Sequence, residues 1–292
     1  MLLVLPGCQT KSAVSQSTSV SEVQPYPLAS QTVDSPKQIE NIYSKNDSLS
    51  YADYEIVKLN KKVRLEQTPN LTEVSYAILR RNGRTLATFD GAFSGFGNAT
   101  DFGLVSLLGG ETKQLVVSQT IPRGGRHWIV GLSPDFRVLF DSNDYGVGRE
   151  EIGIVDIDEN GTYEISQVVT AFYGFENLSS AATPLPEIIF RYDESARKYF
   201  PANQYFQNYM LKGIEQEVVN LKAREGEEYL SRILDITLRY MYTGKEEEAW
   251  SFFNKEYRLQ NKEELKAKIQ AVLKNEAIYR FIYRRGAIKL SR

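Results

Sequence analysis

Three stretches of the chain share one pattern: an apolar run, a short polar turn and a second run that ends in Phe. They are residues 76–89, 128–140 and 188–200. Short apolar runs bounded by turn residues are typical of β-strands. Asn82-Gly83 in the first stretch tolerates the positive φ angles of a two-residue hairpin turn. The repetition therefore predicts similar antiparallel hairpins, stacked or arranged as blades.

Glycine loops extend the similarity beyond the hairpins. A Gly-x-Gly loop at 95–97 precedes the apolar run 102–105, and another at 146–148 precedes the run 152–155. One unit thus recurs after about 50 residues, roughly two and a half times, whereas a closed propeller needs at least about four blades. We expect residues 53–202 to form an antiparallel β-repeat domain, either an open sheet or a partial, propeller-like one.

The hydrophobic period changes to 3.6 residues near Asn203. Apolar residues at this period predict helices over 205–221, over 230–241, from about Lys245 and over 265–282. Residues 203–292 are therefore expected to form an all-α, helical-hairpin domain. Together with the β region, this predicts an α+β fold for the chain.

Part of the helical region has a recognisable spacing. Tyr240, Gly244, Ala249 and Phe253 stand at the Tyr, Gly, Ala and Phe places of a tetratricopeptide repeat, so this part resembles one degenerate repeat of that family. An ordinary αα-hairpin explains the same residues equally well. A lone repeat does not form a peptide groove, and none is predicted from it.

Oxygen-bearing side chains are concentrated in residues 156–164, which read Asp-Ile-Asp-Glu-Asn-Gly-Thr-Tyr-Glu. Side-chain oxygens fall at the first, third, fifth and ninth positions, and Gly161 at the sixth permits a sharp turn. A hard cation such as calcium takes six to eight oxygen ligands. Gln167 stands where an EF-hand has its bidentate Glu, and the flanks read as strands, so this is not an EF-hand.

The segment resembles the calcium loops of FG-GAP (integrin-α-like) and VCBS-type repeats, which join two β-strands. The resemblance implies a structural Ca²⁺ held by four side chains and one backbone carbonyl, namely those of Asp156, Asp158, Asn160 and Glu164, and that of Thr162. The first unit lacks these carboxylates and has Ser106, Leu108, Gly110 and Gln114 instead. The alternative is a plain Asn-Gly hairpin turn flanked by solvated acids.

The chain opens with an apolar run that ends at its one cysteine, Cys8. Leu5, Gly7 and Cys8 resemble the lipobox of bacterial lipoproteins. The resemblance implies lipidation of Cys8 and a lipid-anchored place in the bacterial cell envelope, and Gln9 fits sorting to the outer membrane of a Gram-negative cell. Residues 1–8 are interpreted as the truncated remnant of a signal that begins upstream, because the run is shorter than a signal peptide requires. The alternative is a random apolar N-terminus.

Residues 9–52 are rich in Ser, Thr, Gln, Val and Asn and show no sustained period. Such a segment cannot bury enough apolar surface to offset its ordering entropy. We therefore expect a disordered tether between the lipidated cysteine and the folded body.

Composition limits the chemistry. Lys plus Arg is 35 and Asp plus Glu is 37, a net charge of −2 that argues against a nucleic-acid partner. One Cys and one His exclude a zinc site built from those ligands. His127 has no G-x-S-x-G nucleophile to serve, and Glu150 with Glu151 is the only acid pair worth testing for catalysis. The aromatic residues of 172–175 read either as core or as an exposed ledge for a sugar or protein.

These features predict a non-catalytic, membrane-tethered envelope lipoprotein that acts as a binding module for a protein or glycan partner. Two alternatives remain open at this stage. One is a periplasmic hydrolase that uses acidic residues of the β region. The other is a structural subunit of an envelope complex that docks through its helical end.

Overall fold

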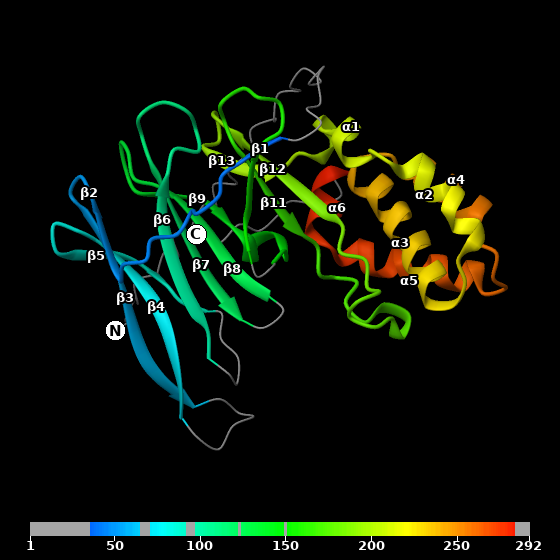
Figure 1. Ribbon diagram of the computed structural model, residues 1–292, viewed down its shortest axis with the longest axis horizontal. Coiled ribbons are helices and arrows are strands. Elements are labelled where there is room, and N and C mark those ends of the chain that lie inside the picture. The colour runs from blue at the N-terminus through cyan, green and yellow to red at the C-terminus, as the bar shows by residue number, and fades with distance from the viewer. Residues whose placement is uncertain (1–35, 65–70, 92–96, 122–123, 149–150, 284–292) are drawn as a thin grey trace, which may run out of the picture.

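The computed structural model describes residues 36–64, 71–91, 97–121, 124–148 and 151–283 (Figure 1). The predicted α+β fold is confirmed: open antiparallel sheets come first, and helices follow. Glu150, residues 1–35 with Cys8 and the remnant 1–8, and residues 284–292 lie outside the described residues.

Within the described residues there are three antiparallel sheets, each a meander of four strands in chain order. The first sheet holds β2 (Ser48–Tyr51), β3 (Tyr54–Arg64), β4 (Leu71–Arg81) and β5 (Arg84–Phe89). The second sheet holds β6 (Ala99–Val105), β7 (Gln114–Ile121), β8 (Gly124–Gly131) and β9 (Arg137–Asp141). The third sheet holds β10 (Gly153–Asp156), β11 (Glu164–Val168), β12 (Glu187–Asp193) and β13 (Lys198–Pro201), with β1 (Lys37–Gln38) added beside β10.

The three predicted hairpins are confirmed as the last two strands of the three sheets, β4–β5, β8–β9 and β12–β13. The two apolar runs that follow the Gly-x-Gly loops lie mainly in β6 and β10, which are the first strands of the second and third four-stranded meanders. Each hairpin is therefore the second half of a four-stranded meander.

The three sheets pack against one another through their apolar faces, and the second sheet lies between the other two. On one side, Val117 and Trp128 of the second sheet pack in a cluster with Leu79 of the first sheet. On the other side, Val116 and Ile129 share a cluster with the third sheet. Successive residues of a strand point to opposite faces of the sheet, and here both members of such pairs, Val116 with Val117 and Trp128 with Ile129, are apolar and buried. The second sheet is therefore apolar on both faces.

An N-terminal segment, residues 37–44, ties the sheets together, and we name it the strap. Its first residues pair with β10, where the Ile39 N–H donates to the Ile154 carbonyl at 3.1 Å. The Ser44 N–H then donates to the Phe102 carbonyl of β6 at 2.8 Å. The chain continues into β2 of the first sheet, as the blue trace in Figure 1 shows.

The predicted tether is wrong over residues 37–51, which contain β1, the strap and β2. These strands are two and four residues long, too short to show a period of their own. Their order comes from hydrogen bonds to strands that the rest of the chain provides. Residues 9–35 of the predicted tether lie outside the described part of the chain.

The helical region begins after β13 and differs from the prediction at two places. The predicted helix 205–221 is interrupted, because Gly213 adopts a left-handed φ of 80° between the two helical segments. The predicted helix 265–282 is divided at Glu276, whose side chain accepts hydrogen bonds from the N–H groups of Ile278 and Tyr279 and so caps a new helix.

The helices are α1 (Gln207–Met210), α2 (Ile214–Asn220), α3 (Gly226–Tyr242), α4 (Glu246–Glu256), α5 (Lys262–Asn275) and α6 (Ala277–Ile282), and 3₁₀ turns flank the first two. The helices α3 and α4 form the expected αα-hairpin, with Ala249 and Phe253 fully buried in its seam and Gly244 at a φ of 81° in its turn. Among the described helices, none is long and apolar enough to cross a membrane.

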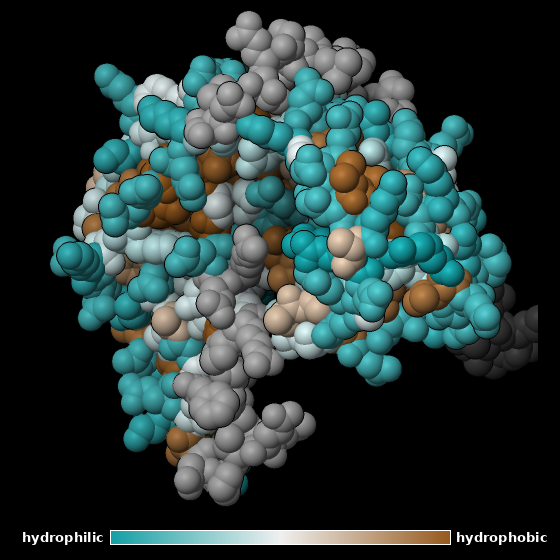
Figure 2. Space-filling view, turned by 45° about the vertical axis from the view of Figure 1, so that its right-hand side comes forward, coloured by the Kyte–Doolittle hydropathy of each residue, from teal (hydrophilic) through white to brown (hydrophobic). Residues whose placement is uncertain are grey.

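The hydrophobic core is continuous between the sheets and the helices. One cluster contains Ile165 and Phe190 of the third sheet together with Ile233 and Phe253 of the helical hairpin. The ring of Phe200 on β13 stacks on the ring of Phe281 on α6, with 5.7 Å between the ring centroids. Hydrophilic residues predominate on the face displayed in Figure 2, and hydrophobic residues form separate patches there. The helices therefore serve as a side wall for the third sheet.

The fold predicts that Gly103→Ala is strongly destabilising. A methyl group at Gly103 would lie 1.7 Å from the strap's Ile42 carbonyl oxygen, so the strap must move off β6. We expect a loss of about 2 kcal/mol or more in the free energy of unfolding, the usual cost of overpacking, measured by urea denaturation. Gly124→Ala, in the same sheet and with 3.9 Å of room, is the matched control. An equal, small effect of both substitutions would contradict the role of the strap.

Candidate metal centre

The acidic loop joins two adjacent strands of the third sheet. Asp156 is the last residue of β10, and Glu164 is the first of β11. The carboxylate of Asp156 accepts hydrogen bonds from the N–H groups of Asn160 at 3.0 Å and Gly161 at 3.1 Å. Gly161 takes a φ of 81°, which glycine adopts without strain. The Asp-x-x-x-Asn-Gly spacing thus folds the loop back onto its first residue.

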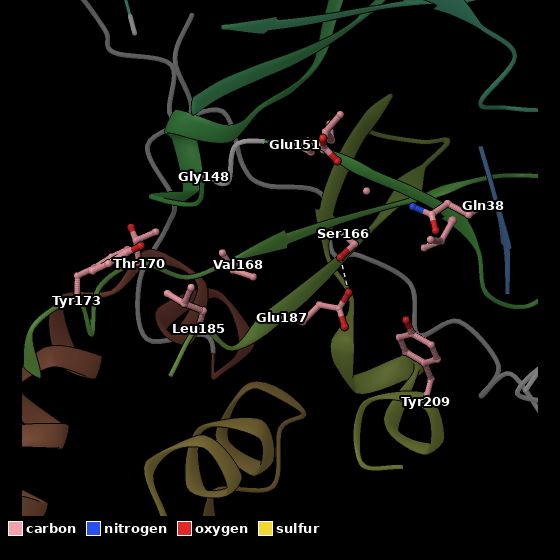
Figure 3. Close-up of a pocket in the computed structure, with 13 residues that line it drawn as sticks. Gln38, Gly148, Glu151, Ser166, Val168, Thr170, Tyr173, Leu185, Glu187 and Tyr209 are labelled. Carbon is pink, nitrogen blue, oxygen red and sulfur yellow. Dashed lines mark hydrogen bonds between the residues drawn. The ribbon is translucent and has the colours of Figure 1, made fainter. Parts of the chain in front are cut away.

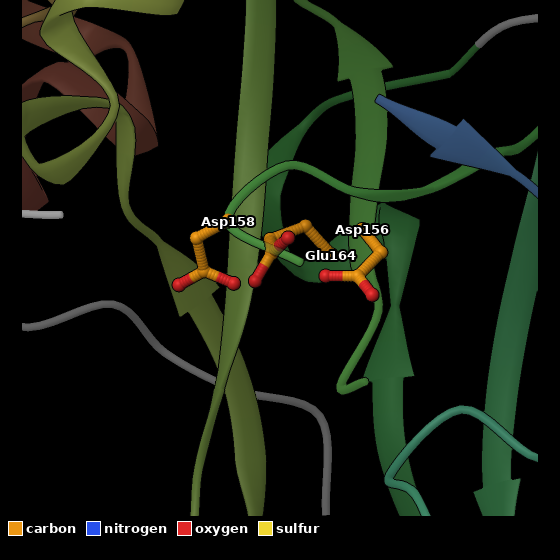
Figure 4. A group of neighbouring side chains, drawn as sticks. All are labelled: Asp156, Asp158 and Glu164. Atoms are coloured by element: carbon orange, nitrogen blue, oxygen red, sulfur yellow. The ribbon is translucent and has the colours of Figure 1, made fainter. Parts of the chain in front are cut away.

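The folded loop brings three of the five predicted ligands together. Carboxylate oxygens of Asp156, Asp158 and Glu164 lie within 4.8 Å of one another. Figure 4 shows the Glu164 carboxylate between those of the two aspartates. Glu164 is 0% exposed and Asp156 is 4% exposed, so two of these acids are withdrawn from water.

Two oxygens of this cluster have no hydrogen-bond partner among the residues that the structure describes. One oxygen of Glu164, Oε2, accepts from the Ile157 N–H at 3.0 Å. The other, Oε1, is buried without a partner, and so is Oδ1 of Asp158. A buried polar oxygen that has lost its water costs roughly 1–3 kcal/mol. A cation bound between the carboxylates would satisfy both atoms.

Electrostatics favour the uptake of positive charge at this point. Burial, with smaller contributions from the charges of Asp158 and Asp156, raises the pKa of the Glu164 carboxyl to about 8. Arg191 on β12 opposes the shift, and its guanidinium lies 3.4 Å from the Asp158 carboxylate. One arginine therefore faces three clustered acids.

The remaining predicted ligands, Asn160 and Thr162, lie at the rim of the cluster. The Asn160 side-chain oxygen accepts from the Thr162 N–H at 2.6 Å and so holds the turn. Both residues line a cavity of about 400 Å³ that also contains Arg191. Arg191 was not predicted as part of the site, because it belongs to the next hairpin and only the fold brings it to the loop.

The second sheet contains an uncharged version of the same connection. There the Gln114 side-chain oxygen accepts from the Leu107 N–H at 2.7 Å, as Glu164 accepts from Ile157 N–H in the third sheet. Both residues begin the second strand of their sheet and are buried. The neutral glutamine is enough for this structural hydrogen bond, so the acid in the third sheet requires another explanation.

Other residues considered from the sequence lie elsewhere. His127 is fully buried within β8, and its Nδ1 is 2.7 Å from the hydroxyl oxygen of Ser118, a residue that is 1% exposed. A substrate cannot reach this pair. Glu151 and Tyr173 line a second, larger cavity, whereas Phe172 is fully buried in the core.

Comparisons with protein families, with curated proteins and with solved structures found no match. No activity is therefore carried over to this chain from another protein.

The raised pKa of Glu164 predicts how stability changes with pH. Without metal, the folded protein holds the Glu164 proton more tightly than the unfolded chain does. The bound proton therefore contributes fully to the free energy of unfolding below pH 4.5, and this contribution is lost as pH rises toward about 8. In EDTA, Glu164→Gln should remove this loss and stabilise the protein by roughly 1–3 kcal/mol at pH 8, as measured by urea denaturation across pH.

Gln114→Glu is the matched control for this prediction, because it places the acid in the equivalent position of the second sheet. It should destabilise the protein at pH 8 and have little effect at pH 4. If Glu164→Gln is instead less stable than the natural protein at pH 8 in EDTA, the ionised carboxylate contributes to the ion-free fold and the interpretation is wrong.

Proposed function

We propose that this chain is a non-catalytic binding module of the bacterial cell envelope, with a structural Ca²⁺ in the loop 156–164 and a lipid anchor on Cys8. The observation that carries the metal assignment is the buried, unpartnered Oε1 of Glu164, which lies in a cluster with Asp156 and Asp158. A solvated hairpin turn, the alternative interpretation, would not bury this oxygen without a partner.

The donor set suits calcium. Three carboxylates supply hard oxygen ligands, and calcium accepts six to eight of them in irregular geometry. The amide oxygen of Asn160, the backbone carbonyl of Thr162 and water would complete the set. The ion would neutralise the acids of one connection between β10 and β11, which is a structural role. Arg191 competes for Asp158 and so lowers the affinity.

The envelope assignment is supported by the sequence around Leu5, Gly7 and Cys8, which resembles a lipobox. A lipid on Cys8, with residues 9–35 as a spacer, would hold the sheets and helices near a membrane, most simply the outer membrane. The burial of the Ser118–His127 pair argues only against hydrolysis that uses these two side chains. The partner would be a protein or a glycan of the envelope.

The calcium assignment predicts that millimolar Ca²⁺ raises the thermal unfolding midpoint by several degrees, because an ion that binds only the folded state stabilises it by mass action. The double variant Asp158→Asn with Glu164→Gln keeps the size of both side chains and the turn that Asp156 holds, and it should lose this response. Differential scanning calorimetry and isothermal titration with CaCl₂ measure both effects.

Glu159→Gln is the control for the calcium experiment, because Glu159 is an exposed acid of the same loop that lies outside the cluster. This variant should retain the response. Equal calcium heats for the natural protein and the double variant would dismiss the site.

The anchor predicts that Cys8→Ser moves the protein from the membrane fraction to the soluble fraction when the chain is expressed in bacteria behind a complete signal peptide. The thiol of Cys8 is the atom that would carry the lipid, and serine cannot replace it in that reaction. Fractionation with immunoblotting measures the change. Ser12→Ala is the control, and continued membrane association of Cys8→Ser would show that lipidation is not the anchor.

A further inference from the structure

A larger cavity lies on the third sheet, on the face that points away from the second sheet. Its volume is about 560 Å³, and its floor includes Gly153 of β10, Ser166 of β11 and Glu187 of β12 (Figure 3). Tyr173 and Tyr209 also line it, and Figure 3 shows them on opposite sides of the floor. Further along the same face, Val155 and Ile189 are covered by Phe206 and Met210, so only part of the face is filled.

The second sheet shows what occupies the equivalent place. Gly103 of β6 pairs with Val116, as Gly153 of β10 pairs with Ser166. The strap passes directly over Gly103, so closely that a methyl group there would meet the Ile42 carbonyl. In the third sheet the corresponding glycine lines a cavity, and a methyl group on it would meet the Ser166 side chain at 2.9 Å instead of another segment of main chain. An extended chain thus covers the glycine of the second sheet, whereas a cavity lies beside its counterpart in the third.

Among the described residues, the charges that line the cavity are of one sign. Of the thirteen described lining residues, Glu151 and Glu187 are acidic and none is Lys or Arg. Glu187 accepts a short hydrogen bond from the Ser166 hydroxyl, which directs its carboxylate along the floor, as Figure 3 shows. Tyr173 is 43% exposed and offers a ring to a ligand. Carboxylates combined with tyrosine rings suit an ammonium or guanidinium group.

We propose that this cavity binds an extended, positively charged peptide segment of a partner protein. Its main chain would cross near Gly153 as the strap crosses Gly103, and its Lys or Arg side chains would reach Glu151, Glu187 and the face of Tyr173. The charge favours a basic peptide over a neutral glycan. The site is separate from the acidic loop, so the proposal goes beyond the proposed calcium module and does not depend on the ion.

The test uses fluorescein-labelled tetralysine amide as the probe and fluorescence anisotropy in EDTA at low ionic strength. The double variant Glu151→Gln with Glu187→Gln should bind the probe about tenfold or more weakly, because both carboxylates that face the cation are lost. Gln at position 187 still offers an oxygen to Ser166, so the fold is preserved. Tyr173→Ala, at an exposed position, should weaken binding about threefold.

A matched control separates specific binding from general attraction to a mildly acidic protein. Glu247→Gln with Glu263→Gln removes the same charge from exposed helical positions and should leave the affinity unchanged. Equal weakening by both double variants would overturn the proposal. Binding of labelled chitotetraose without binding of tetralysine would also overturn it.

The calcium-site variant Asp158→Asn with Glu164→Gln distinguishes this proposal from the proposed function. If this variant keeps its affinity for tetralysine, the peptide site stands whether or not the loop binds calcium. If it loses the peptide as fully as the Glu151 and Glu187 variant does, the acidic loop is the attracting feature and the cavity proposal is wrong.

Discussion

Burial of the second sheet on both faces is the interaction on which the rest of the structure depends. Strand β7 is buried over most of its length, with Val117 turned to the first sheet and Val116 to the third. An antiparallel sheet usually has one solvated face, so this arrangement requires a neighbour on each side. The first and third sheets are therefore held in place by one shared layer, and the strap adds main-chain hydrogen bonds along two of the sheet edges.

The similar build of the second and third sheets then helps to explain where the acidic loop and the cavity lie. Equivalent positions of the second and third sheets have the same backbone role but different surroundings. Gln114 and Glu164 accept equivalent main-chain hydrogen bonds, and Gly103 and Gly153 stand at equivalent places in the two ladders. In the middle sheet these positions are closed by the strap and by packing. Among the described residues no further sheet packs beyond the third one, so the equivalent positions there are not covered by another sheet. Both the acidic loop and the open cavity are found there.

Much of this architecture was predictable from the sequence, because it rests on local patterns. The hairpins at 76–89 and 128–140 and the change to a helical period near Asn203 depend on alternation and turn residues a few positions apart. The acidic loop was predictable for the same reason, since Asp156 and Gly161 fold it within one short segment.

What could not be predicted depends on contacts between distant segments. The strap has no periodicity and is ordered only by β6 and β10. The division of the last helix depends on the side-chain hydrogen bonds of Glu276, which compete with the helical pattern around it. Arg191 reaches Asp158 only because β12 lies beside β11. The cavity likewise combines Gln38, Glu151, Glu187 and Tyr209 from four separate parts of the chain.

The acidic loop and the cavity share the strands β10 and β11, and this has a physical consequence. Val155 pairs with Glu164 two positions along the ladder from the pair of Gly153 and Ser166, with the pair of Ile154 and Ile165 between them. Three neighbouring carboxylates at the end of such a short two-stranded connection repel one another unless a proton on Glu164, Arg191 or a cation offsets their charge. A proton and an arginine each neutralise one acid, whereas a divalent ion can hold all three at once. The proposed cation would therefore match the whole cluster, and it would fix the end of two strands that also contribute to the floor of the cavity.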